Sequence, residues 1–285
     1  MNLTKDQILI QNIIKCSADL LISSAEIDLL ISELFTNFEQ EPQSIGDIKN
    51  AVLHKYELLQ GAYDRPRSKY DVIKEKLLIS KYVSECFESY TNLEQAISHK
   101  PQAVSIAYWY SNIYAQEASD AFADLFDSCD KIQADSFVSV CESISDEDVL
   151  GVIPIANSND GRLMSFYRLI DKFDLKISAI HNVENPNGDG FSRFALVGKK
   201  LYDLGSSGNK SIEFSVVGNL ISIVCITEFV GGTVKEITSI PSPHKNNDCL
   251  NYITASISDN NLHMLWWFLY LFSGDVEFIG FYSEN

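Results

Sequence analysis

Basic side chains are scarce in this 285-residue chain. Lysine and arginine total 22 against 39 aspartates and glutamates, so the formal net charge is −17 at pH 7. Proteins that bind nucleic acid or anionic lipid need a basic face that meets the phosphate groups. We therefore expect no nucleic-acid partner and no membrane partner.

The sequence also lacks a long, uninterrupted apolar run. Its most apolar stretch, LHMLWWFLYLF (262–272), is too short to span a bilayer, which takes about 20 residues. This stretch predicts a buried amphipathic helix. The opening residues MNLTKDQILIQNIIK show no cationic leader before an apolar segment, so we expect a cytoplasmic protein.

Paired cysteine and histidine motifs are missing as well. The six cysteines have no C-x-x-C spacing, and the five histidines form no H-x-x-x-H or H-E-x-x-H pair. Scattered cysteines are typical of buried free thiols in a reducing compartment, and a zinc site needs clustered ligands. We expect no metal and no cofactor.

The N-terminal third of the sequence has a helical pattern. Apolar residues recur at helical spacing from Asp6 to Phe38, which predicts one long helix, and two further helices are predicted over 47–61 and 69–97. Helices with such stripes bury them by pairing, and a second copy of the chain could serve as the partner. We expect a helical domain over 1–100.

From Gln102 onward, strand and helix patterns alternate. This alternation favours an α/β lobe with an open, mostly parallel sheet over 101–205. From Lys210 the order becomes βαββαβ, which predicts a ferredoxin-like domain over 206–285. The fold class expected is α+β with three domains. The strands of the lobe are predicted over 103–110, 131–134, 149–155, 175–183 and from 194, and its helices over 113–126, from 135 and over 161–173.

One segment, GDGFSRFALVGKK (188–200), places a hydroxyl beside a guanidinium at the start of an apolar strand. On pattern alone, Ser192 and Arg193 belong to a solvated turn before a core strand. They could also meet an anionic ligand. The residues themselves leave both interpretations open.

Several motifs together resemble one family. VLGVIPIANSNDG (149–161) resembles the G-V-x-P-I-E-N-S-x-x-G motif of prephenate dehydratases, and SRFALVGKK (192–200) resembles their T-R-F-L-V-I motif. The tail resembles an ACT regulatory domain, because GNL (218–220), TSIPS (238–242) and IGFYS (279–283) are similar to G-A-L, E-S-R-P-S and L-G-S-Y-P. The helical N-terminal part lies where bifunctional members carry a chorismate mutase domain.

The resemblance implies roles for particular residues. Ser192 would stand for the threonine that serves as acid toward the leaving hydroxide, and Arg193 would keep the guanidinium of that motif. The substrate would meet Asn157 and Ser158, near an expected helix N-terminus that favours an anion, and also Tyr114 and Gln116. A helix N-cap with a turn is the other interpretation of residues 157–160. A regulatory ligand would meet Gly218, Asn219, Leu220 and Ser239.

Several residues differ from those of the family, and these differences argue against the mutase and dehydratase reactions. No lysine or arginine occurs between Lys15 and Lys49, and Asp28 and Glu39 stand where the mutase carries cations. These carboxylates would repel a dianionic ligand, so we expect no mutase activity.

The dehydratase site also lacks parts. Ala115 and Gln116 replace a serine and a histidine of the opening motif. About ten residues after Ile180 replace a whole second lobe, which removes one wall of the substrate cleft.

The regulatory tail is altered as well. Asn219 replaces a small alanine, and Thr238 and Ile240 replace the charged residues of E-S-R-P. These replacements weaken the groups that would bind the ammonium and carboxylate of phenylalanine. Pairing of two such domains into a homodimer is still expected.

Three hypotheses follow for the function. The first is a diverged protein of aromatic amino acid or shikimate-derived metabolism that has lost the parent activities. It would bind a small aromatic or prephenate-like acid, or regulate a partner enzyme. The second is an active dehydratase or decarboxylase that uses Ser192 and Arg193. The third is a structural dimerisation scaffold.

Overall fold

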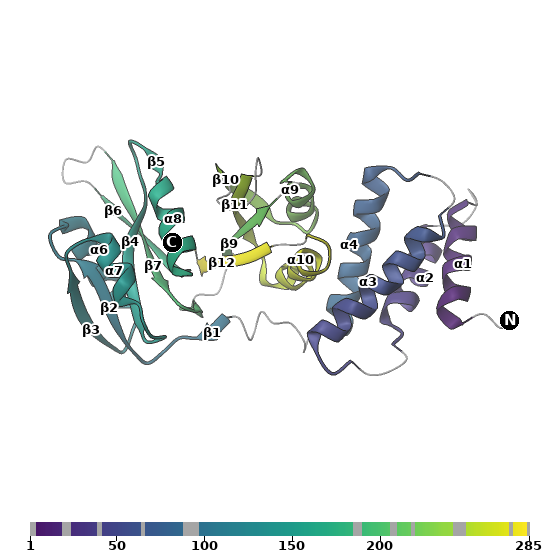
Figure 1. Ribbon diagram of the computed structural model, residues 1–285, viewed down its shortest axis with the longest axis horizontal. Coiled ribbons are helices and arrows are strands. Elements are labelled where there is room, and N and C mark those ends of the chain that lie inside the picture. The colour runs from purple at the N-terminus through teal and green to yellow at the C-terminus, as the bar shows by residue number, and fades with distance from the viewer. Residues whose placement is uncertain are drawn as a thin grey trace. The chain divides into compact units, whose positions relative to one another are not determined.

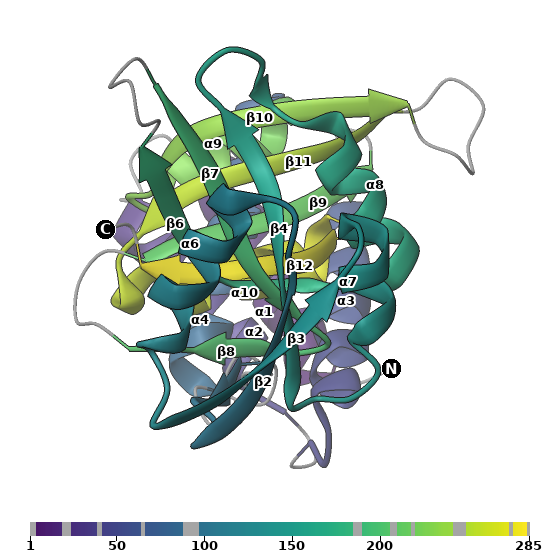
Figure 2. The ribbon, with the colours of Figure 1, turned by 90° about the vertical axis from the view of Figure 1, so that its left-hand side faces the viewer.

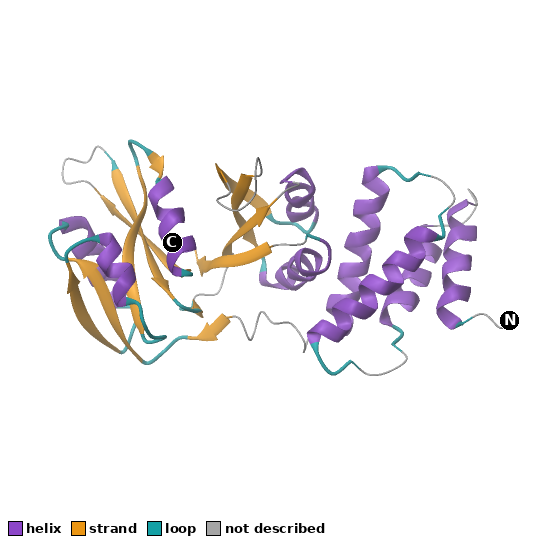
Figure 3. Cartoon of the chain, viewed as in Figure 1, coloured by secondary structure: helices purple, strands orange, loops and turns teal. Residues whose placement is uncertain are grey.

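The computed structural model divides the chain into two compact units (Figures 1 and 3). The helical unit comprises Met1–Leu93, Ile221–Gly231 and Asn260–Val276, and the sheet unit comprises Glu94–Leu220, Gly232–Asp259 and Glu277–Asn285. The C-terminal part of the chain therefore contributes to both units. The division into three domains at 100/101 and 205/206 stays a prediction. The structure describes residues 4–18, 24–38, 42–63, 66–87, 97–184, 190–205, 210–217, 220–241, 249–273 and 276–283.

The helical unit begins with two separate helices, α1 (Lys5–Ala18) and α2 (Ser24–Thr36), which pack against each other. The prediction of one long helix over 6–38 is therefore wrong. Ser17 lies in the last turn of α1 and Ser24 begins α2, and serine hydroxyls compete for backbone partners, which weakens a helix interior. The Ser17 hydroxyl donates to the Ile13 carbonyl at 2.7 Å in the last turn of α1.

Two further helices, α3 (Ile45–Gly61) and α4 (Lys69–Cys86), match the predicted positions. Serine side chains cap both helices, since Ser44 Oγ accepts the Asp47 N–H and Ser68 Oγ accepts the Asp71 N–H. Helix α4 ends at Cys86, earlier than the predicted 97. Two further helices among the described residues of this unit are α9 (Leu220–Phe229) and α10 (Asp259–Phe272). No helix among the described residues is both long and apolar enough to cross a membrane.

The sheet unit is built on one twisted sheet with the strand order β10-β11-β9-β12-β6-β7-β4-β2-β3. Figure 2 shows β9 to β12 crossing the direction of β4 and β7. A short strand, β5 (Gly161–Arg162), pairs with β4, and β1 (Ile97–His99) pairs with β8 (Leu201–Asp203). The strands of the main sheet are β2 (Ala103–Trp109), β3 (Ser128–Ala134), β4 (Val149–Asn157), β6 (Lys176–Glu184), β7 (Phe191–Gly198), β9 (Lys210–Val217), β10 (Thr233–Pro241), β11 (Cys249–Ile257) and β12 (Val276–Ser283).

The sheet is mixed. Strand β2 runs parallel to β3 and β4, whereas β7 runs antiparallel to both β4 and β6. Strand β6 ends at Glu184 and β7 begins at Phe191, which leaves too few residues for the crossover of a dozen or more that a parallel pair needs. The α/β character expected for the lobe is confirmed, whereas its sheet is mixed and not mostly parallel, and the antiparallel step follows from this short connection.

Helices cover the two faces of the lobe (Figure 2). Helix α6 (Ile113–Ala123) packs on the face that carries Val152 and Leu196. Helices α7 (Phe137–Ser143) and α8 (Met164–Phe173) pack on the face that carries Ile153 and Val197. Because side chains alternate along a strand, neighbours such as Val152 and Ile153 on β4, or Leu196 and Val197 on β7, belong to different helical layers.

The last part of the chain has the expected element order β9-α9-β10-β11-α10-β12. Its strand order β10-β11-β9-β12 continues directly into β6 through a parallel contact between Gly280 and Ile177. A Cβ on Gly280 would lie 3.3 Å from Ile177 Cβ and 3.0 Å from Glu213 Cβ. The missing side chain therefore permits the two strand sets to join into one sheet.

Candidate functional site

The candidate site lies at the ends of β4 and β7, where the two motif segments meet. Asn157 is the register partner of Ser192, and Ala156 is the partner of Arg193. After Asn157 the chain turns back, so that Gly161 pairs with Asn157 in a β4–β5 hairpin. Gly161 has φ +68°, a left-handed conformation that favours glycine. The motif N-S-N-D-G thus forms a tight β-turn.

The Asn157 side chain holds this turn. Its Oδ1 accepts the N–H groups of Asn159 at 2.9 Å and Asp160 at 2.7 Å, and its Nδ2 donates to Asp160 Oδ2 at 2.9 Å. The turn interpretation accounts for these contacts. The helix predicted over 161–173 begins later, because α8 starts at Met164 and the β4–β5 hairpin lies between it and Asn157. Stabilisation of an anion by that helix stays a prediction.

Ser158 continues the pairing of the two strands beyond Asn157. Its N–H donates to the Phe191 carbonyl at 3.0 Å, and its Oγ accepts the Phe191 N–H at 3.2 Å. The exposed Ser158 hydroxyl thus fastens the strand ends to each other.

Ser192 and Arg193, adjacent in sequence, face opposite sides of the sheet. Ser192 shares its face with Phe194 and with its register partner Val183, both of which are buried in the layer under α6. Arg193 shares the other face with Ala195, which is buried in the layer under α7 and α8. The hydroxyl and the guanidinium are therefore separated by the strand backbone.

Arg193 is oriented by its neighbour on β6. Its Nε donates to Asn182 Oδ1 at 2.8 Å, and Asn182 is also its register partner. The Phe191 ring centroid lies 5.6 Å from the guanidinium carbon. Among the described residues, no hydrogen bond engages the two terminal Nη groups of Arg193. These groups form a fork of the kind that binds a carboxylate through two parallel bonds.

Arg193 lines a cavity of about 540 Å³. The cavity is rich in cationic and hydrogen-bonding groups, which suits a small anion. Its volume is in the range of about 300–1,000 Å³ that small-molecule sites occupy. The lining residues are Arg162, Ile180, His181, Asn182, Arg193, Lys235, Glu236, Thr254, Tyr282 and Ser283.

Arg162 forms the fixed end of this cavity. Its Nε donates to Glu236 at 2.7 Å, its Nη1 to Tyr167 at 2.7 Å and to Glu213 at 3.0 Å, and its Nη2 to Thr254 at 2.9 Å. The Arg162 side chain is only 7% exposed. With its donors used in this way, Arg162 is a structural cation, whereas Arg193 is a cation available to a ligand.

Glu213 is the buried counter-charge of Arg162. Its carboxylate is fully buried and also accepts hydrogen bonds from Tyr167 at 2.9 Å and from Tyr282 at 3.1 Å. Burial, and then the Glu213 charge, raise the pKa of both phenols well above the ordinary value. Sequence analysis missed this network. One signal was available, since Glu213 is a single acid in the apolar strand KSIEFSVV and needs a buried cation.

The other predicted residues lie apart from Arg193. Tyr114 and Gln116 are on α6, on the Ser192 side of the sheet; Tyr114 packs against the buried layer, and Gln116 is exposed. No hydrogen bond between described residues joins either of them to Ser192. Leu220 begins α9, and the exposed Ser239 on β10 donates to Asn251 at 2.7 Å. Gly218 and Asn219 lie outside the described residues, as does Glu39.

In the part of the chain that the structure describes, no group of three or more histidine, cysteine, aspartate or glutamate side chains could hold a metal ion.

Comparison with known proteins identifies the fold. No protein-family model and no curated protein matches the chain significantly. Among solved structures, prephenate dehydratase from Streptococcus mutans is similar, with a TM-score of 0.51 and 14% identity over 63% of this chain and 97% of that chain. Prephenate dehydratase from Arthrobacter aurescens in complex with L-Phe has a TM-score of 0.50 and 13% identity over 64% of this chain and 90% of that one. The chain has a prephenate dehydratase-like fold.

Proposed function

We propose that this chain is a diverged prephenate dehydratase-like protein that binds a small carboxylic acid at Arg193 and has lost the dehydration reaction. The observation that carries this proposal is the short connection between β6, which ends at Glu184, and β7, which begins at Phe191, because it leaves no room for the second lobe that would form the other wall of the substrate cleft. The placement of Ser192 and Arg193 on opposite faces of β7 adds to it. A general acid must lie within about 3 Å of the atom that it protonates. A ligand held by Arg193 has the strand between itself and the Ser192 hydroxyl.

Binding of an acid is supported by the Arg193 cavity. Asn182 fixes the Nε side of the guanidinium, which leaves the Nη fork directed to a carboxylate. The carboxylate would replace water in a cavity where Arg162 is already neutralised by Glu213 and Glu236. An aromatic or prephenate-like acid fits this chemistry.

The βαββαβ element order supports the ACT-like character of the last part of the chain. We include in the proposal that this part pairs with a second copy, and that the dimer serves a regulatory or partner role in aromatic amino acid metabolism in the cytoplasm. The ligand of an ACT-like site would meet Leu220 and Ser239.

The test combines turnover with binding. Purified protein is incubated with prephenate and with chorismate, and the appearance of phenylpyruvate is followed by absorbance; we expect no turnover. Thermal shift with prephenate and phenylpyruvate then reports binding. Ligand at 100 times its dissociation constant adds about 2.7 kcal/mol of stability. Arg193→Met should abolish the shift, whereas the exposed Arg168→Met on α8 is the matched control and should keep it.

Two outcomes contradict the proposal. Turnover that disappears in Ser192→Ala would show an active dehydratase or decarboxylase instead. A complete absence of acid binding would leave the dimerisation scaffold as the function.

A further inference from the structure

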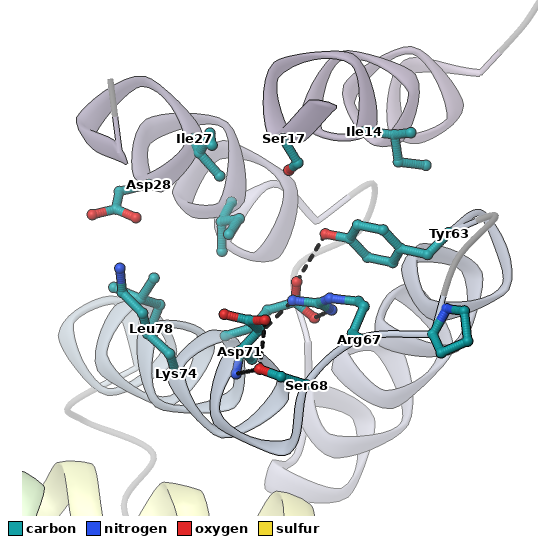
Figure 4. Close-up of a pocket in the computed structure, with 13 residues that line it drawn as sticks. Ile14, Ser17, Ile27, Asp28, Tyr63, Arg67, Ser68, Asp71, Lys74 and Leu78 are labelled. Carbon is teal, nitrogen blue, oxygen red and sulfur yellow. Dashed lines mark hydrogen bonds and ion pairs between the residues drawn. The ribbon is translucent and has the colours of Figure 1, made fainter. Parts of the chain in front are cut away.

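The helical unit contains a larger cavity, of about 790 Å³, between α1, α2 and α4 (Figure 4). It belongs wholly to the helical unit and does not depend on the function proposed for the Arg193 site. Its lining combines an apolar wall with a few charged groups. The lining residues are Ile14, Ser17, Ile27, Asp28, Ile31, Tyr63, Pro66, Arg67, Ser68, Asp71, Lys74, Glu75 and Leu78.

The apolar wall comes from three helices and the segment before α4. Ile14 lies on α1, Ile27 and Ile31 on α2, and Leu78 on α4, with the Tyr63 ring at one end. Such a surface binds an aliphatic or aromatic group, because each square ångström of apolar area removed from water contributes about 25 cal/mol.

One end of the cavity holds an ion pair, in which the charges of Arg67 and Glu75 cancel. Glu75 is 4% exposed, and its carboxylate accepts hydrogen bonds from Arg67 at 2.9 Å, Gln60 at 2.6 Å and Tyr63 at 3.0 Å. The Arg67 guanidinium stacks 4.1 Å from the Tyr63 ring centroid. Burial, and then Glu75, raise the pKa of Tyr63 to about 12, so its hydroxyl keeps the proton that it donates. This end is satisfied without a ligand.

The opposite end presents two unlike charges. Asp28 on α2 and Lys74 on α4 both line the cavity, and Figure 4 shows their side chains extending to the same side of it. No hydrogen bond or ion pair within the described residues engages either group. Asp71 differs from them, because it completes the N-terminal cap of α4 with Ser68. One carboxylate and one ammonium therefore lie at the end of an apolar cavity.

We propose that this cavity binds an α-amino acid with an apolar side chain. Its ammonium would meet Asp28, its carboxylate would meet Lys74, and its side chain would lie along Ile14, Ile27, Ile31 and Leu78. An α-amino acid carries its ammonium and its carboxylate on the same carbon. Both groups therefore point toward Asp28 and Lys74 when the side chain lies along the apolar wall. A dicarboxylate would be repelled by Asp28, and a simple amine would leave Lys74 without a partner.

The experiment titrates the full chain carrying Arg193→Met, so that an aromatic acid cannot bind in the Arg193 cavity. Calorimetry uses three probes that share one side chain: L-phenylalanine, its deaminated acid 3-phenylpropionate, and its carboxylate-free amine phenethylamine. L-Leucine and glycine test the apolar wall. We expect saturable binding of phenylalanine or leucine, and binding of the two truncated probes and glycine weaker by about tenfold or more.

Variants locate the binding. Asp28→Asn and Lys74→Met should each weaken amino-acid binding by about tenfold or more, while the melting temperature stays close to that of the parent. Glu57→Gln on α3 and Lys15→Met on α1 are exposed controls outside the cavity lining and should change nothing. Arg193→Met should leave amino-acid binding intact, which separates this site from the acid-binding cavity.

Three results would overturn the inference. One is the lack of saturable amino-acid binding at millimolar concentration. Another is binding that persists unchanged in both Asp28→Asn and Lys74→Met, which would place the ligand elsewhere, for example beside Ser239. The third is binding of 3-phenylpropionate to Arg193→Met as tight as that of phenylalanine, because Asp28 would then have no role.

Discussion

Glu213 and Arg162 form a buried ion pair, with 3.0 Å between the carboxylate and the guanidinium and almost no exposure of either side chain. Arg162 follows the motif turn in the lobe, whereas Glu213 lies on the first strand of the βαββαβ segment. The pair therefore ties together the two strand sets that meet at Gly280. Neither charge could be left alone in such surroundings without a large penalty.

The first prediction concerns the removal of one partner. Arg162→Met should lower the free energy of unfolding by about 3–5 kcal/mol, because it leaves the Glu213 carboxylate buried without its cation. Lys81→Met is the matched control, since its pair with Glu85 is about half exposed on both sides and should contribute at most about 1 kcal/mol. Urea unfolding monitored by circular dichroism measures both. If Arg162→Met lowers the free energy of unfolding by less than about 1 kcal/mol, Glu213 is not left as a buried charge without a partner.

The second prediction concerns alkaline pH. Burial raises the pKa of Tyr167 and of Tyr282 above the ordinary value near 10, so the folded state keeps protons that the unfolded state releases. Stability from these groups is complete below about pH 10 and is lost as the pH rises from there toward the folded pKa values. Each phenol should cost about 1.4 kcal/mol per pH unit in that window.

Unfolding free energies at intervals between pH 8 and pH 11 check this dependence. Tyr282→Phe should make the decline above pH 10 shallower, although the variant loses one hydrogen bond to Glu213 at every pH. The exposed Tyr70→Phe on α4 should leave the slope unchanged. An identical slope for Tyr282→Phe and the parent protein would contradict the buried phenol.

The third prediction separates a turn residue from a ligand residue. Asn157→Ala removes the side-chain hydrogen bonds that hold the β4–β5 turn and should cost about 1–2 kcal/mol of stability. Acid binding at Arg193 should change less than about twofold, because Asn157 does not line that cavity. Asn159→Ala, in the same turn, contributes only its backbone N–H and is the control. Calorimetric titration and thermal unfolding of each variant give the two readouts, and a loss of acid binding without a loss of stability would assign Asn157 to the ligand.

Much of the fold could be predicted because its patterns are local. The apolar runs of β2 and β4 and the βαββαβ order are read from neighbouring residues. The break between α1 and α2 was missed because the apolar periodicity continues through the serines. The β4–β5 hairpin was missed because N-S-N-D-G signals a helix cap and a β-turn equally well.

The site was harder to predict because its geometry depends on distant partners. That Ser192 and Arg193 point to opposite faces follows from strand alternation, but only once β7 is known to begin at Phe191 rather than after Arg193. The contacts of Arg162 reach Glu213, Glu236 and Thr254, which are 51, 74 and 92 positions away in the chain. Neither periodicity nor a motif carries information over such separations.

The Arg162 side chain has a consequence for how this protein can change over evolutionary time. Its donors are shared among side chains from α8, β9, β10 and β11. A substitution at any one of these positions leaves a polar group of another residue buried without its hydrogen-bond partner. Tolerated substitutions must therefore occur together. In a set of homologues, Arg162 and Glu213 should therefore be exchanged jointly for apolar residues or not at all, whereas Arg193, whose terminal groups carry no such ties, is free to vary with the ligand.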